Sequence, residues 1–130
     1  MKTIVAAYCF RGKGPDHEIL LITSSTGRWI VPKGQTEKRW GKREVAMMEA
    51  WEEGGVKGRV VGRAKSFVIR RGPKAEWRFF PILIEDLAAD WPEKDSRKRR
   101  FASRKEAKRL IDNSDLAEAV SKLAKKYKKL

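Results

Sequence analysis

The chain has 130 residues, with 31 Lys and Arg against 17 Asp and Glu, and a formal net charge of +14. This length fits one domain whose core needs no disulfide or metal, and a hydrophobic content of 41% excludes a disordered polyelectrolyte. The positive charge predicts anionic partners, such as nucleotides, inositol phosphates, RNA or an anionic membrane surface.

The N-terminal segment begins with Lys2 and an apolar run, as a secretory signal does. The run stops at Phe10 without a small-residue cleavage pattern, and no stretch approaches the roughly 18 apolar residues of a membrane-spanning helix. The one cysteine, Cys9, has no partner for an intrachain disulfide, which fits a reducing compartment. We therefore expect a soluble, cytoplasmic protein.

Short apolar runs separated by turns predict strands in the first third of the chain. Residues 3–10 and 18–23 flank the turn "GKGPD" and predict a β-hairpin, with His17 exposed in its loop. Residues 28–32 predict a third strand. The segment 42–53 contains no Gly or Pro and predicts a helix, which the following two glycines end.

The second half of the chain predicts another hairpin and two helices. Residues 59–69 have strand composition, and "RRGPK" turns the chain into a further strand that runs to about residue 84. A capping box at Ser103 opens a short helix to about residue 111. An amphipathic helix with a lysine-covered outer face follows over about 114–128, because apolar residues recur there at spacings of three and four: Leu116, Val120, Leu123, Tyr127 and Leu130.

No repeat or linker divides the chain, so strands interleaved with helices predict one mixed α/β or α+β domain. Three of the five tryptophans are expected to pack in the core or at its edge rather than to stack on bases: Trp29, Trp77 and Trp91.

Three glutamates at the end of the first predicted helix are the first candidate functional residues. Glu49, Glu52 and Glu53 share one narrow arc, at about 100° per residue. Like charges at these spacings cost roughly 0.2–0.5 kcal/mol per pair, and the last turn of a helix disfavours carboxylates as well. A solvated acidic face is one interpretation. A site for a divalent cation is the other, because carboxylate oxygens suit Mg²⁺, Mn²⁺ or Ca²⁺.

Residues 34–56 resemble the Nudix box, G-x5-E-x7-R-E-U-x-E-E-x-G-U, in which U is a bulky aliphatic residue. The flanking segments resemble the diphosphoinositol polyphosphate phosphohydrolases of that family and their bacterial relatives, over about residues 3–112. The resemblance implies a single Nudix domain over 1–130 with an α/β/α sandwich around a mixed β-sheet. The positions that match the box are Gly34, Glu49, Glu52, Glu53, Gly55 and Val56.

The resemblance also implies the roles of the acidic residues. Glu49 and Glu53 would bind Mg²⁺ or Mn²⁺, Glu52 would be a further ligand or the base for the attacking water, and the backbone carbonyl of Lys33 would complete the metal site. A bound ion would act there as Lewis acid and template for phosphoryl oxygens.

Two positions depart from the box, since Trp40 and Met48 replace the expected Glu and Arg. Exchange of a partly buried ion pair for an apolar pair is often neutral or stabilising, and a Met sulfur contacts an indole favourably. We therefore expect Trp40 to pack on Met48. The double replacement leaves open an inactive domain that only binds its ligand.

The remaining charge of a polyphosphorylated substrate needs cationic and hydroxyl donors. Residues "DSRKRRF" contain four basic side chains in succession, a run that is equally suited to RNA phosphates. The resemblance implies substrate contacts before the box, in the second hairpin and before the last helices, at Arg11, Ser24, Ser25, Arg28, Arg70, Arg78, Arg97 and Arg99.

The sequence thus predicts a Mg²⁺- or Mn²⁺-dependent pyrophosphohydrolase for a small, highly charged phosphoanhydride. Diphosphoinositol polyphosphates and dinucleoside polyphosphates are the first candidates, and capped or triphosphorylated RNA ends are a third. The alternative is a basic module on the same scaffold that binds RNA or a nucleotide without turnover. The oligomeric state stays open.

Overall fold

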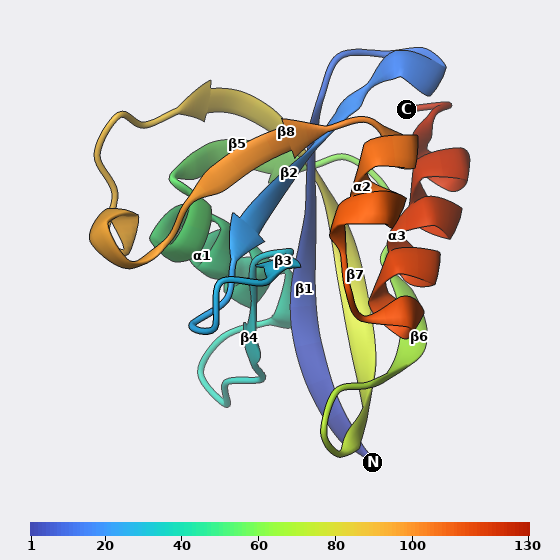
Figure 1. Cartoon of the computed structure of the whole chain (residues 1–130). Helices are drawn as coiled ribbons and strands as arrows, with labels where there is room; N and C mark the ends of the chain where they lie inside the picture. Colours follow the sequence, from blue (N-terminus) through green and yellow to red (C-terminus); the bar gives the residue numbers. More distant parts are fainter.

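The computed structural model describes all 130 residues, which form a β-sheet with helices on both of its faces (Figure 1). The elements follow the chain in this order: β1 Lys2–Arg11, the 3₁₀ turn η1 Gly14–Asp16, β2 Glu18–Thr23, β3 Trp29–Ile30, β4 Lys33–Gln35, α1 Lys42–Gly54, β5 Val56–Val60, β6 Lys65–Arg70, β7 Lys74–Leu87, the 3₁₀ turn η2 Lys94–Ser96, β8 Arg99–Ala102, α2 Arg104–Leu110 and α3 Ser114–Tyr127.

The sheet has eight strands and is mixed. Its central path runs β3-β2-β1-β7-β5, while β4 pairs with β1, β6 with β7 and β8 with β2. Strands β1 and β7 are parallel, and the other pairs are antiparallel. The predicted hairpins are confirmed, since β1 pairs with β2 and β6 pairs with β7 across their turns.

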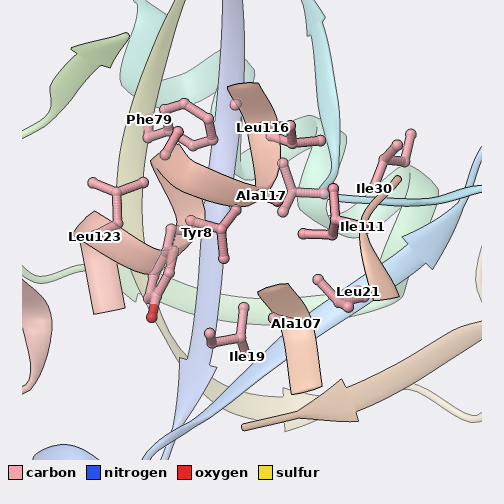
Figure 2. Close-up of a cluster of buried hydrophobic side chains, with 14 of the residues drawn as sticks. Tyr8, Ile19, Leu21, Ile30, Phe79, Ala107, Ile111, Leu116, Ala117 and Leu123 are labelled. Atoms are coloured by element: carbon pink, nitrogen blue, oxygen red, sulfur yellow. The ribbon is translucent and has the colours of Figure 1, made fainter. Parts of the chain in front are cut away.

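Strand β1 is buried on both faces, and its alternating side chains belong to two cores. Val5, Ala7 and Cys9 pack with Val45, Ala46 and Ala50 of α1, whereas Ala6, Tyr8 and Phe10 pack with α2 and α3. Figure 2 shows the second core, where Tyr8, Ile19 and Phe79 of the sheet meet Leu116 and Leu123 of α3. The predicted α/β/α sandwich around a mixed sheet is therefore confirmed.

The helix signals read from the sequence are present in the structure. Ser103 and Glu106 form a reciprocal capping box at the start of α2. The predicted apolar stripe is buried along α3 up to Tyr127, but Leu130 lies beyond the helix end and is 44% exposed.

The strand expected over 59–69 is interrupted between β5 and β6. Both pieces run antiparallel to β7, and the break lies between the registers Val60↔Ile82 and Lys65↔Phe79. The facing segment of β7 contains Pro81, which has no N–H for a ladder bond. The strand expected over 28–32 is likewise reduced to Trp29–Ile30.

The prediction that His17 is exposed is wrong. The residue is 3% exposed, and its Nε2 lies 2.6 Å from the Tyr8 hydroxyl. Its Nδ1 donates to the Gly14 carbonyl at 2.8 Å, because a carbonyl oxygen can only accept. His17 therefore closes the β1–β2 turn onto the core. Elsewhere, no helix is long and apolar enough to cross a membrane.

Candidate active site

Helix α1 carries the three glutamates, and its C-terminal end is fixed by contacts from outside the helix. Gly55 takes the left-handed conformation at φ 66°, which only glycine adopts without strain. The Arg99 guanidinium donates to the carbonyls of Gly54 at 3.0 Å and Ala88 at 2.7 Å. It also lies 4.0 Å above the Trp91 ring. Arg99 thus caps α1 at its negative dipole end.

Glu53 is the most enclosed carboxylate of the chain. The residue is 6% exposed, its Oε1 accepts from the Lys33 amide at 3.0 Å, and its Oε2 lies 3.5 Å from Arg97 Nη2. Trp91 Nε1 donates to the Glu53 carbonyl at 3.1 Å. Burial raises the pKa of the Glu53 carboxyl to about 7, although the Lys33 amide and Arg97 act in the opposite direction. The cost of desolvation therefore exceeds the gain from these partners.

Glu49 lies directly against Gly34, the first residue of the box. A Cβ at position 34 would come within 2.6 Å of the Glu49 Cδ, so a side chain there would displace the carboxylate. Burial raises the pKa of Glu49 to about 7, and repulsion from Glu53, Glu52 and Glu93 adds to this effect. The glycine therefore allows α1 and the β4 segment to approach closely.

Glu52 and Glu93 complete the acidic group. Repulsion from the Glu52 carboxylate adds to the raised pKa of Glu49, and the Glu52 backbone carbonyl accepts from the Glu93 amide at 3.0 Å. The Glu93 carboxylate accepts from Arg97 Nε at 2.8 Å. Sequence reasoning missed Glu93, because a glutamate 40 positions after the helix gives no sign that the chain returns there.

The donor set of this site fits a hard divalent cation in its chemistry. Glu49, Glu52 and Glu53 offer carboxylate oxygens, and a cation would relieve the repulsion that raises the pKa of Glu49. The side chains are not drawn together as a ready-made cage: no group of three or more His, Cys, Asp or Glu is placed to hold a metal ion. The Lys33 amide donates to the Glu53 carboxylate, so the backbone of Lys33 lies at the site. The predicted ligand carbonyl belongs to the same residue.

Five of the eight predicted substrate residues line two cavities. Ser24, Ser25 and Arg97 line one cavity of about 490 Å³, and Arg28 and Arg70 line a neighbouring one of about 370 Å³. Trp29 lines both cavities, so they lie next to each other.

Three predicted substrate residues make other contacts. Arg11 pairs with Glu18 and covers the Phe101 ring, Arg78 donates to Ser66, and Arg99 caps α1. Arg28 also has a partner, since its Nη1 lies 3.0 Å from Asp112 in an exposed pair that competes weakly with a ligand.

Sequence reasoning did not single out Arg71 or the side chain of Lys33. Arg71 lines both the cavity of Arg28 and Arg70 and a third cavity of about 270 Å³, which also contains Lys33. The Lys33 Nζ lies 5.6 Å from the Trp77 ring centroid, and burial and Arg71 lower the pKa of this lysine. The three cavities share lining residues, Trp29 and Arg71, and we call their basic lining beside the glutamates the basic groove. The sequence predicted the run "RRGP" as a turn and only its first residue, Arg70, as a substrate contact.

The two departures from the box lie on the outer side of the molecule. Trp40 is 47% exposed, just before α1, and Met48 is partly buried on the helix. Packing of Trp40 on Met48 stays a prediction. Of the three tryptophans expected to pack, Trp77 is buried in the core, and Trp29 and Trp91 are partly buried.

Comparison with known proteins identifies relatives over most of the chain. No model of a protein family matches the sequence. The human diphosphoinositol polyphosphate phosphohydrolase 3-alpha is 32% identical over 114 residues, covering 85% of this chain and 69% of that protein. The chloroplastic Nudix hydrolase 21 of Arabidopsis thaliana is 32% identical over 112 residues, covering 82% and 57%.

Solved structures share the fold at low sequence identity. The Ap4A hydrolase of C. elegans, in a binary complex, superposes with a TM-score of 0.74 at 14% identity over 96% of both chains. A NUDIX hydrolase from Nitrosomonas europaea gives a TM-score of 0.76 at 13% identity, over 98% and 91%. The sandwich, the glutamates on α1 and the identity to the human and plant proteins lead to one conclusion. The chain belongs to the Nudix hydrolase family.

Proposed function

We propose that the protein is a Mg²⁺- or Mn²⁺-dependent pyrophosphohydrolase that cleaves a phosphoanhydride bond in a small, highly anionic molecule. The observation that carries the proposal is the position of Glu49 and Glu53, which are held against Gly34 and the Lys33 amide beside the basic groove. Burial raises the pKa values of both carboxyls to about 7, which supports roles in binding a cation and in exchanging protons.

In this proposal, the glutamates and the loop before them bind the ion. Glu49, Glu53 and the Lys33 carbonyl act as ligands, and Glu52 is a further ligand or accepts the proton of the attacking water at its carboxylate. The ion supplies Lewis acidity and a template for the phosphoryl oxygens. The Arg97 guanidinium contacts Glu53, Glu93 and the Thr23 carbonyl, which holds Glu53 in position. Arg97 also lines the cavity of Ser24, where its remaining N–H groups would bind a phosphate.

The basic groove favours a substrate that carries phosphates over its whole length. Four basic side chains line two of its cavities: Lys33, Arg28, Arg70 and Arg71. Its third cavity, that of Ser24 and Arg97, has a single hydrophobic lining residue, Trp29. A diphosphoinositol polyphosphate, the substrate named for the human relative, fits this charge distribution best. A dinucleoside polyphosphate, named for the C. elegans structure, would require an aromatic surface for its bases, and the aromatic residues of the groove are Trp29 and Trp77, of which Trp77 is only 2% exposed.

Metal-dependent release of phosphate from a panel of phosphoanhydrides tests this function. Wild type should release phosphate or pyrophosphate with Mg²⁺ or Mn²⁺, and Glu53→Gln should lose at least about 100-fold in rate. Glu118→Gln is the matched control, because Glu118 lies on α3 in a surface pair with Lys108. Release that persists without metal, or in Glu53→Gln, would contradict the proposed roles.

The rival function is binding of RNA or a nucleotide without turnover. It is favoured by the exposed Trp40 in place of the box glutamate and by the absence of a preassembled metal cage. If no phosphoanhydride is cleaved while labelled RNA is retained with a steep salt dependence, the rival replaces the hydrolase.

A further inference from the structure

A fourth cavity, of about 790 Å³, lies at the sheet edge where β5 ends. Only one of its lining residues, Arg43 in the first turn of α1, lies within the box, and none lines the basic groove. The cavity contains Phe10 of β1, whereas Gly34 of the box pairs with Val5. Five residues of strand separate these positions by about 17 Å. The cavity is therefore distinct from the candidate active site.

The interruption between β5 and β6 creates the wall of this cavity. The chain leaves the ladder after Val60, and the Val61 amide donates to the Pro81 carbonyl at 3.0 Å. The Tyr127 hydroxyl then donates to the Arg63 carbonyl at 2.9 Å, which ties the segment to α3. Because Tyr127 is buried, the wall is anchored in the core and the cavity is preformed.

The floor of the cavity is apolar. It consists of Phe10, Val60, Val61, Leu83 and Leu130. A volume in this range accepts a small organic molecule, whose body would be removed from water there.

The rim of the cavity is cationic and largely unpaired. Lys13, Arg43, Arg59 and Arg63 line it, and only Arg59 has a carboxylate partner, Glu85, at 3.0 Å. The other ion pairs of the chain involve none of these residues. Three cations around an apolar floor match a ligand with one anionic head, because the head gains charge-assisted hydrogen bonds while the body is buried.

We propose that this cavity binds a small amphiphilic anion, with a carboxylate or phosphate head on an apolar body. The site needs no metal and does not depend on the proposed function of the box. The head lies among Lys13, Arg43 and Arg63, and the body covers Leu83 and Val60. A fully polar polyphosphate does not fit, because it leaves the floor exposed to water.

Fluorescence of 1-anilinonaphthalene-8-sulfonate, itself an amphiphilic anion, tests the proposal on the full chain in EDTA. We expect one saturable site per chain, with near-UV circular dichroism confirming the native fold. Decanoate or adenosine monophosphate should displace the dye, and decanol and inorganic phosphate should not, because each lacks one half of the ligand. Displacement by decanoate identifies an aliphatic acid, and displacement by the nucleotide identifies an aromatic phosphate.

Two double variants with the same change in net charge complete the test. Lys13→Glu with Arg63→Glu should weaken dye binding by about tenfold or more, because two rim cations become anions. Lys105→Glu with Arg109→Glu, both exposed on α2, should leave binding unchanged, as should Glu53→Gln at the box. Equal binding by both double variants, or displacement by decanol alone, would overturn the proposal.

Discussion

At the residue scale, Gly34 controls the position of a candidate metal ligand. We expect Gly34→Ala to leave the thermal midpoint nearly unchanged, because the methyl group meets the flexible end of Glu49. Hydrolysis should nevertheless fall by about tenfold to 100-fold, since displacing a positioned group by 1 Å has effects of this order. Steady-state rates at saturating Mg²⁺ and calorimetry on the same samples measure both quantities.

Gly41 provides a closely matched control for this substitution. A Cβ at position 41 would also meet a carboxylate, that of Glu44, which is exposed and lies outside the site. Gly41→Ala loses some stability, because alanine is a poorer N-cap than glycine, but should retain activity. Equal rates for Gly34→Ala and wild type would show that the place of Glu49 does not matter for catalysis.

At the scale of one element, the C-terminal end of α1 depends on Arg99. Arg99→Gln should lower the free energy of unfolding by about 1–3 kcal/mol, because two carbonyls lose a charged donor and the helix loses a cation at its negative end. Arg100→Gln removes only an exposed pair with Glu106 at 3.6 Å and should cost less than about 1 kcal/mol. Urea denaturation measures both values. If Arg99→Gln raises KM without loss of stability, the substrate contact predicted from the family resemblance is the correct role.

The start of α2 depends on the capping box of Ser103 and Glu106. Ser103→Ala should cost about 1 kcal/mol, because the Glu106 amide loses the hydroxyl that accepts from it at 3.2 Å. Ser25→Ala, at an exposed serine, should change stability by less than about 0.5 kcal/mol. Urea midpoints that shift equally for the two variants would mean that the capping box contributes nothing.

For the molecule as a whole, local sequence patterns predicted the helices and strands but not the contacts between residues that are far apart in the chain. The short apolar runs with their turns, the glycines after α1 and the Ser103 box lie within a few residues of what they determine, and these predictions are confirmed. Arg99 and Glu93 act on α1 from about 40 residues away, and Pro81 breaks a ladder 20 residues before it. Such contacts depend on the tertiary fold, which residue spacing does not encode.

The whole-molecule response to pH follows from the two buried carboxylates. The pKa values of Glu49 and Glu53 are raised from 4.5 to about 7, so the folded state binds more protons than the unfolded chain between these values. Stability therefore falls as pH rises from 4.5 to 7. Glu106 contributes the opposite dependence at lower pH: its pKa is lowered, and its contribution is lost as pH falls through that lowered value. We expect the thermal midpoint in EDTA to decrease across the window from pH 4.5 to 7. The decrease should be less steep in Glu49→Gln and unchanged in slope in Glu118→Gln.

Mg²⁺ should raise the thermal midpoint above this pH window and have little effect below it, because only ionised carboxylates bind the cation. A midpoint that rises with pH across the window in wild type, or a Mg²⁺ effect that is equal at both ends, would contradict the placement of a metal at these carboxylates.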